Sequence, residues 1–205
     1  MNYLEFRSKL FSLACFSIDQ VYAWQPGFDR NNLSRWAKTG LLIRLRQGYF
    51  AFPEYKGKQD FALFFANRIY RPSYISLHTA LSFYGMIPEA VVQISSVSAL
   101  KTASFTNPFG EYTYQSVKPF LMFGYGLKSF SDGMALQMAC PEKALLDLLY
   151  LYPAYNTYRD MEDLRLDEDY LHDDLNKELL LKYCAQFKSK ALEKRVQRMI
   201  TIYEL

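Results

Sequence analysis

Cysteine is scarce in this chain of 205 residues, and its three copies, Cys15, Cys140 and Cys184, are far apart. They form no CxxC pair and no cluster with histidine, which excludes the ligand spacings of structural zinc sites. An odd number of dispersed cysteines also argues against a disulfide framework. We therefore expect a protein of a reducing compartment, by default the cytoplasm, with Cys15 and Cys140 buried in apolar stretches.

Long hydrophobic runs are absent as well. No segment reaches the roughly 18 apolar residues that a membrane-spanning helix needs. The first residues, Met1 to Phe6, lack the basic and then apolar pattern of a signal peptide. The sequence therefore predicts no membrane partner.

The chain has only two histidines, and no catalytic motif surrounds either of them. His78 lies in an expected core helix and His172 in an acidic run, and neither belongs to an HExxH, GxSxG, P-loop or GxGxxG pattern. Residues 160 to 174 are acidic, but they lack the glycine and the ligand spacing of a calcium loop. We expect no enzymatic activity, no cofactor and no bound metal.

One group of residues keeps an enzymatic alternative open. Asp132, followed by Glu142 and Lys143 after an expected strand, is similar to the acid and lysine set of metal-dependent nucleases. Those enzymes place one residue between the acid and the lysine on one strand, whereas Glu142 and Lys143 are adjacent at the start of an expected helix. The simpler interpretation is that Glu142 complements the helix dipole and that Lys143 lies on the surface.

Aromatic residues, in contrast, are abundant. The chain has 17 tyrosines and 16 phenylalanines, and half of its residues are apolar, which indicates a large folded core rather than disorder. A length of 205 residues is sufficient for two small domains. We find no internal repeat and no low-complexity tract.

The net charge of +3 is small but unevenly distributed along the chain. Residues 1 to 58 hold nine lysines and arginines against four acids, and residues 71 to 150 hold five of each sign. Residues 159 to 174 hold eight acids against two arginines, and residues 176 to 200 hold seven bases against two acids. The basic excess at the N-terminus indicates an anionic partner for this part of the chain.

The segment from Asp29 to Gly40 has the pattern of a short amphipathic helix. Asp29 is suited to cap its N-terminus, and Gly40 is suited to end it. At about 100° per residue, one face of the helix is apolar and the other polar. The apolar face consists of Leu33, Trp36 and Ala37. The polar face consists of Asn31, Ser34, Arg35 and Lys38, side-chain types that contact base edges and phosphates in a major groove.

A β-hairpin is predicted directly after this helix. The first strand begins at Leu42 and alternates apolar and basic side chains from Ile43 to Arg46. Gln47 and Gly48 supply a turn, and residues 49 to 52 return before Pro53. Arg44 and Arg46 are expected on one strand face, roughly 7 Å apart, a spacing comparable with that of successive phosphates along a DNA strand.

Two further helices are expected before this unit, at 3 to 14 and 16 to 24, with a turn at 25 to 27. Together these elements predict a winged helix-turn-helix over residues 1 to 56. Residues 57 to 205 predict a mixed α/β domain that ends in helices, so that the fold class is α+β. Helices are expected at 60 to 70 and 76 to 85, after Pro141, and at about 189 to 203 within a helical end. Strands are expected near 91 to 97, 112 to 117, 120 to 123 and 134 to 138, with turns at 107 to 110 and 131 to 133.

Three stretches, in this order and at this spacing, resemble those of AbiEi-family antitoxins, the transcriptional regulators of type IV toxin–antitoxin systems. They are LSRWAKTGLLIRLRQGYFAFP from Leu33, YISLHTALSFYGMIPE from Tyr74, and PEKALLDLLYL from Pro141. The resemblance covers most of the chain up to Leu151, whereas residues 152 to 205 match only in being helical.

The resemblance implies an N-terminal winged helix that binds inverted repeats in the double-stranded DNA of its own promoter. It also implies a C-terminal domain that counters a nucleotidyltransferase-like toxin. The DNA-binding role falls on Asn31, Ser34, Arg35, Lys38, Arg44 and Arg46. Two other functions remain open: a metal-dependent nucleic-acid enzyme, and a protein-interaction module that uses a winged helix to dock partners.

Overall fold

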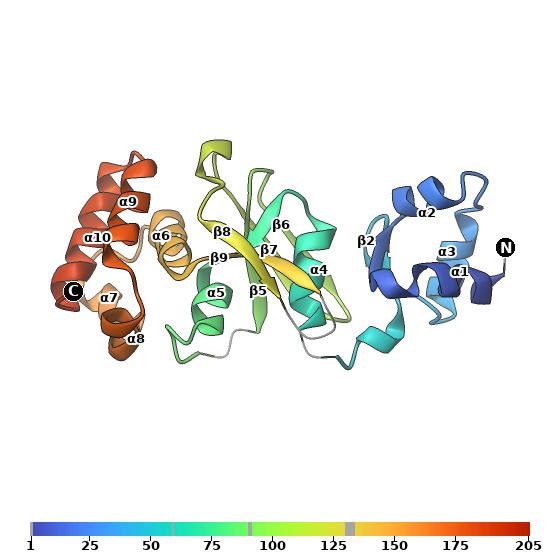
Figure 1. Ribbon diagram of the computed structural model, residues 1–205, viewed down its shortest axis with the longest axis horizontal. Coiled ribbons are helices and arrows are strands. Elements are labelled where there is room, and N and C mark those ends of the chain that lie inside the picture. The colour runs from blue at the N-terminus through green and yellow to red at the C-terminus, as the bar shows by residue number, and fades with distance from the viewer. Residues whose placement is uncertain (1, 59, 90–91, 130–133) are drawn as a thin grey trace.

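The computed structural model describes residues 2–58, 60–89, 92–129 and 134–205. The fold is α+β and elongated, with N-terminal helices at one end, a large sheet in the middle and C-terminal helices at the other end (Figure 1).

The N-terminal unit, as we call the elements from residue 3 to residue 55, combines three helices with a small sheet. Its elements are α1 (Tyr3–Leu10), η1 (Phe11–Leu13), β1 (Cys15–Ser17), α2 (Ile18–Trp24), α3 (Asn31–Lys38), β2 (Ile43–Arg46), β3 (Tyr49–Ala51) and η2 (Pro53–Tyr55). The sheet is antiparallel in the order β1-β3-β2. The helix expected at 16 to 24 is confirmed as α2, and Ser17 and Gln20 form a reciprocal capping box at its start.

The rest of the chain builds a larger sheet and its covering helices. The elements are α4 (Phe61–Ile69), β4 (Ser73–Ile75), α5 (Leu77–Phe83), β5 (Gln93–Ser98), β6 (Ala103–Asn107), β7 (Gly110–Ser116), η3 (Pro119–Leu121), β8 (Tyr125–Ser129), β9 (Ala135–Ala139), α6 (Pro141–Leu151), α7 (Tyr158–Glu162), α8 (Glu168–Asp173), α9 (Lys177–Gln186) and α10 (Lys190–Ile202). Within the described ranges, α10 is the longest helix with 13 residues, and none is long and apolar enough to cross a membrane.

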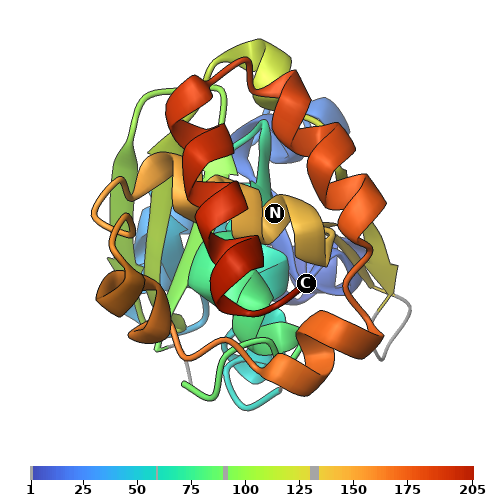
Figure 2. The same ribbon diagram turned by 90° about the vertical axis from the view of Figure 1, so that its left-hand side faces the viewer.

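The large sheet has the order β6-β7-β5-β4-β9-β8, with the pairs β4/β9 and β5/β7 parallel and its other pairs antiparallel. Helix α4 covers the face toward the N-terminal unit, and α5 and α6 cover the opposite face (Figure 1). Helices α9 and α10 pack on the outer side of α6 (Figure 2). Helix α6 therefore lies between the sheet and the terminal helices, where it has little contact with water.

Several expected elements differ in the structure. The segment expected as a strand at 120 to 123 falls instead on the 3-10 helix η3, because Pro119 favours a helical start. The first helix stops at Leu10 instead of continuing to residue 14, where Ala14 has a φ of 60°. Strands β1, β4, β6 and β8 were not expected. The turn predicted at 131 to 133, and Val91 of an expected strand, lie outside the described residues.

The three cysteines are free thiols. Cys15 is buried in the N-terminal unit and Cys184 in α9, whereas Cys140, which was expected to be buried, is partly exposed just before α6. Burial raises the pKa of the Cys15 thiol to about 12 and that of the Cys184 thiol to about 11. Both buried thiols are therefore protonated, and unreactive, near neutral pH.

Candidate nucleic-acid interface

Helix α3 is held in place at both ends. The Asp29 carboxylate accepts a hydrogen bond from the Asn31 N–H at 3.0 Å, although Arg30 rather than Asp29 occupies the N-cap position. At the other end the chain leaves the helix through Gly40, whose φ of 75° few other residues adopt without strain. The predicted start and end of the helix are therefore correct to within a residue.

The apolar face of α3 fixes how the helix lies on the N-terminal unit. Leu33 and Trp36 are almost fully buried, with 1% and 4% of their surface exposed. The Trp36 ring packs on Phe6 of α1, with 4.7 Å between the ring centroids, and on Tyr3 at 5.4 Å. Because this face is anchored by large aromatic rings, the opposite face is directed to solvent.

The opposite face carries all four residues predicted for it. Asn31, Ser34, Arg35 and Lys38 are exposed. The Arg35 guanidinium donates a hydrogen bond to Oδ1 of Asn32 at 2.6 Å, which holds it close to the helix. The face thus offers an amide, a hydroxyl and two cations on a rigid element.

The hairpin of β2 and β3 places both arginines at the same hollow, but in different surroundings. Arg44 is exposed, with its guanidinium carbon 5.7 Å from the centroid of the Phe50 ring. The pairing with β3 shifts between Arg44 and Arg46, which indicates a bulge, so regular alternation does not continue from one arginine to the next. Gly48, with a φ of 80°, forms the predicted turn.

Arg46 lies between the N-terminal unit and the large sheet. Its guanidinium donates to the backbone carbonyl of Ile69 at 2.5 Å and lies 4.7 Å from the centroid of the Phe105 ring. The amide of Asn107 donates to the carbonyl of Leu45 at 3.2 Å and adds a second bond between the same two parts. Arg46 therefore holds the hairpin against α4 and β6, while it also lines the hollow next to Arg44.

A hollow of about 450 Å³ opens between α3 and the hairpin turn. Its polar lining includes Arg30, Ser34, Arg44, Arg46 and Gln47, and the described part of that lining contains no carboxylate. Arg30 and Gln47 were not predicted for the interface. Arg30 lies four residues before Ser34, which places the two on one side of a helix, and this spacing was the signal available in the sequence.

The proposed catalytic set at the start of α6 is engaged in packing. Lys143, expected on the surface, is fully buried and forms an ion pair with Asp147 one turn later. The Glu142 carboxylate is also buried and accepts a hydrogen bond from the Asn176 N–H at 3.0 Å. The prediction for Lys143 was wrong because α6 is apolar on almost every side and has no solvent-exposed face for a lysine at this position. Asp132 lies outside the described residues.

Lys143 and Asp147 belong to a buried cluster with Tyr74 and Ser76. The Lys143 ammonium donates to the Tyr74 oxygen at 2.8 Å, and the Tyr74 and Ser76 hydroxyls each donate to Oδ2 of Asp147 at 2.9 Å. Burial lowers the pKa of Lys143, and the Asp147 carboxylate opposes this effect. The cluster ties α6 to β4 and to the start of α5.

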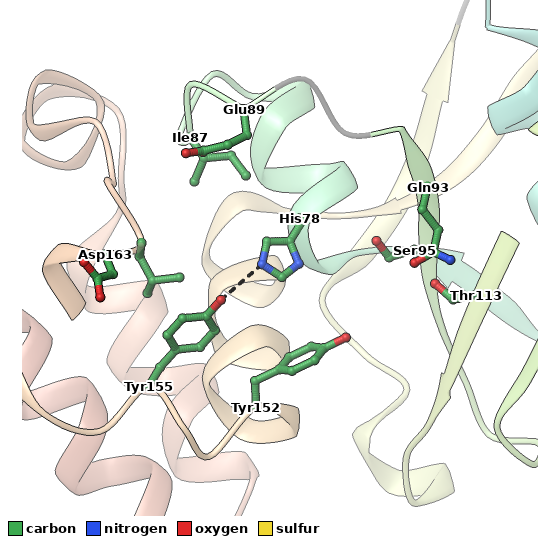
Figure 3. A pocket seen from close by; sticks show the side chains of 10 residues that line it. His78, Ile87, Glu89, Gln93, Ser95, Thr113, Tyr152, Tyr155 and Asp163 are labelled. Carbon is green, nitrogen blue, oxygen red and sulfur yellow. Dashed lines mark hydrogen bonds between the residues drawn. The ribbon is translucent and has the colours of Figure 1, made fainter. Parts of the chain in front are cut away.

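His78 of α5 lines a different hollow, of about 370 Å³ (Figure 3). Helix α5 lies on the far side of the large sheet from the N-terminal unit (Figure 1). Its Nε2 lies 3.4 Å from the Tyr155 hydroxyl, and its ring packs edge-on against Tyr152. Burial lowers the pKa of His78, while the charge of Glu89 raises it. The lining of the hollow combines rings and hydroxyls with the carboxylates of Glu89 and Asp163. Within the described residues, no group of three or more His, Cys, Asp or Glu is placed to hold a metal ion.

No protein-family model matches this chain, and a search among curated proteins finds no significant match. The resemblance to AbiEi-family antitoxins therefore depends on the three stretches themselves. Two of those stretches meet in the buried cluster, because Tyr74 and Ser76 come from the second and Lys143 and Asp147 from the third.

Proposed function

We propose that this chain is a DNA-binding transcriptional regulator whose N-terminal unit is a winged helix-turn-helix. In this proposal α2 and α3 form the helix-turn-helix, α3 enters the major groove, and the hairpin of β2 and β3 is the wing. The observation that carries the proposal is the position of α3 beside the hairpin turn, with one face anchored and the other polar and exposed.

The residues divide by the contacts that their chemistry favours. Asn31 and Arg35 have side chains that can pair bidentately with base edges, as an amide does with adenine and a guanidinium with guanine. Arg30, Arg44 and Ser34 surround the hollow next to the turn, where a backbone phosphate would meet two guanidiniums and a hydroxyl. Lys38 at the end of the helix adds a further cation for the backbone.

The second half of the proposal is an antitoxic role, and it rests on the resemblance. A regulator of this kind would repress its own promoter through inverted repeats and would counter a nucleotidyltransferase-like toxin. The residues of the antitoxic surface are left unassigned, because the resembling stretches beyond the N-terminal unit supply mainly buried packing residues such as those of the buried cluster.

Fluorescence anisotropy with a DNA fragment from the chain's own promoter tests the DNA-binding role. Arg35→Ala and Arg44→Ala are each expected to weaken binding by about 1 to 3 kcal/mol. Lys182→Ala is the matched control, since it removes one exposed cation from α9 at the other end of the molecule (Figure 1). Unchanged affinity in both arginine variants, or no binding by the wild type at low salt, would remove the proposed interface.

The antitoxic role has a separate test. The chain is co-expressed with the product of a neighbouring gene of nucleotidyltransferase type, and growth is followed. Rescue of growth by the wild type and by Arg35→Ala alike is expected, because the antitoxic domain lies outside the DNA interface. Absence of rescue would leave a regulator without an antitoxic role.

A further inference from the structure

Two arginines stand between the N-terminal unit and the large sheet, where they line two hollows at once. Arg68 is in the last turn of α4 and Arg71 follows that helix directly. The first hollow, of about 540 Å³, lies toward the sheet and includes Asn67, Leu127 and Gln137 in its lining. The second, of about 200 Å³, lies toward the N-terminal unit. The two guanidiniums therefore form the boundary between both spaces.

Nothing in the described parts of the chain neutralises these two charges. The Arg71 Nε donates to the carbonyl of Asn67 at 3.2 Å, and the Arg68 guanidinium lies 4.7 Å from the centroid of the Phe64 ring. Neither arginine has a carboxylate partner among the described residues, and the described lining of both hollows contains none. Burial, and then the nearby Arg71 charge, lowers the pKa of Arg68. The pair is thus a cationic site that an anion would stabilise.

Asn67 lines the first hollow and brings a third hydrogen-bond donor, which has no acceptor among the described residues. Only 7% of Asn67 is exposed, and its Oδ1 accepts a hydrogen bond from the Gln137 N–H at 2.5 Å. That bond fixes which end of the amide is oxygen. The Nδ2 is then a buried donor with no partner within the described parts of the chain. A buried donor without an acceptor is rare in folded proteins, so this amide is a candidate donor to an oxygen of a bound ligand.

We propose that Asn67, Arg68 and Arg71 form a binding site for a phosphoryl group. A phosphate matches the site because it offers several acceptor oxygens and close to two negative charges, while the guanidinium is the side chain best shaped to pair with it. The exposed Leu127 and the adjacent Pro72 give an apolar wall for the remainder of a phosphorylated small molecule, such as a nucleotide. This site is independent of the proposed reading of DNA by α3.

Isothermal titration calorimetry of the full chain with pyrophosphate and with ATP is the first test. Saturable binding is expected, and Arg68→Gln and Arg71→Gln should each weaken it about ten- to a hundredfold. Arg71→Lys should weaken binding less, because lysine keeps the positive charge and loses only the planar, two-pronged hydrogen bonding of the guanidinium. Lys182→Gln on α9 is the matched control. Binding by the two glutamine variants as tight as that of the wild type would overturn the proposal.

Asn67→Asp separates the ligand role from a structural one. The aspartate keeps an acceptor for the Gln137 N–H but replaces the donor by an oxygen, so it should abolish phosphate binding while the circular dichroism spectrum is unchanged. Tight binding of pyrophosphate by this variant would contradict the assignment of Nδ2.

A second arm distinguishes a small molecule from the DNA backbone as the source of the phosphate. If pyrophosphate and ATP do not bind, but Arg68→Gln and Arg71→Gln weaken binding to promoter DNA and reduce its salt dependence, then the site holds a DNA phosphate. If neither small phosphates nor DNA respond to these substitutions, no phosphoryl site exists there. The calorimetric arm contains no DNA, so its result does not depend on the proposed regulatory function.

Discussion

Lys143 and Asp147, one helical turn apart on α6, form an ion pair that solvent does not reach. Two hydroxyls, from Tyr74 and Ser76, donate to the same carboxylate. The pair therefore has the additional hydrogen bonds that buried charges require.

Removal of one partner is expected to be costly. Asp147→Ala leaves the Lys143 ammonium buried without its counter-charge, and we expect the free energy of unfolding to fall by about 3 to 5 kcal/mol. The double variant Lys143→Met with Asp147→Leu replaces both charges by apolar side chains and should lose much less. Urea unfolding followed by circular dichroism measures both. A loss below about 1 kcal/mol for Asp147→Ala would indicate a solvated pair.

Gly124 is expected to tolerate no side chain. Its φ is 67°, and a Cβ at this position would lie 3.1 Å from Cβ of Lys143 and 3.0 Å from the Tyr183 ring. Backbone strain and overpacking together should make Gly124→Ala cost about 2 kcal/mol or more. Gly57→Ala is the control, because a Cβ there meets nothing within 4 Å. Equal melting temperatures for the two variants would show that the residues around Gly124 can shift to accommodate a methyl group at little cost.

Arg44 and Arg46 should separate DNA binding from stability. Arg46→Ala removes the hydrogen bond to the Ile69 carbonyl and is expected to lower the free energy of unfolding by about 1 to 3 kcal/mol. Arg44→Ala should leave stability unchanged within about 0.5 kcal/mol, while the slope of log affinity against log salt falls by about 1. Chemical denaturation and salt titrations of DNA affinity measure the two effects. If Arg44→Ala lowered stability and Arg46→Ala lowered the salt slope of DNA binding, then Arg46, not Arg44, would contact the phosphates.

His78 should make stability depend on pH. Its folded pKa is lowered by burial, against an opposing contribution from Glu89, so the unfolded chain binds the proton more tightly. Stability is therefore full above the ordinary histidine value of about 6.5 and falls as the pH drops through the lowered folded pKa. His78→Gln should remove part of this fall in urea unfolding between pH 7 and pH 5. His172→Gln is the control, and an identical effect of both substitutions would exclude a specific role of His78.

The sequence predicts the elements that have strong local signals. Helix α3 combines a regular apolar stripe with an acid at its start and a glycine at its end, and α6 begins with Pro141 at the favoured position. Strand β6 carries serine, threonine and asparagine, and it lies at the edge of the sheet as the structure describes it, next to β7. Its sequence pattern therefore resembles that of a loop.

Long-range contacts account for the remaining differences. The position of Arg46 depends on Ile69 and Phe105, which are distant in the sequence, and no local pattern distinguishes it from Arg44. The burial of Lys143, in contrast, has a local signal, because the surrounding leucines of α6 indicate a helix without a solvent-exposed face. A lysine four residues before an aspartate on such a helix is a signal for a buried pair rather than for a surface one.

Cys15 and Cys184 lie at opposite ends of the molecule, so the reactivity of each thiol can measure local unfolding at its own end. One thiol is buried in the N-terminal unit and the other in α9, and burial raises the pKa of both. An alkylating reagent can modify either thiol only when the surrounding structure opens, so the rate of modification measures a local opening free energy. Equal rates at the two thiols would mean that the whole chain unfolds as one cooperative unit, and unequal rates would identify the weaker end.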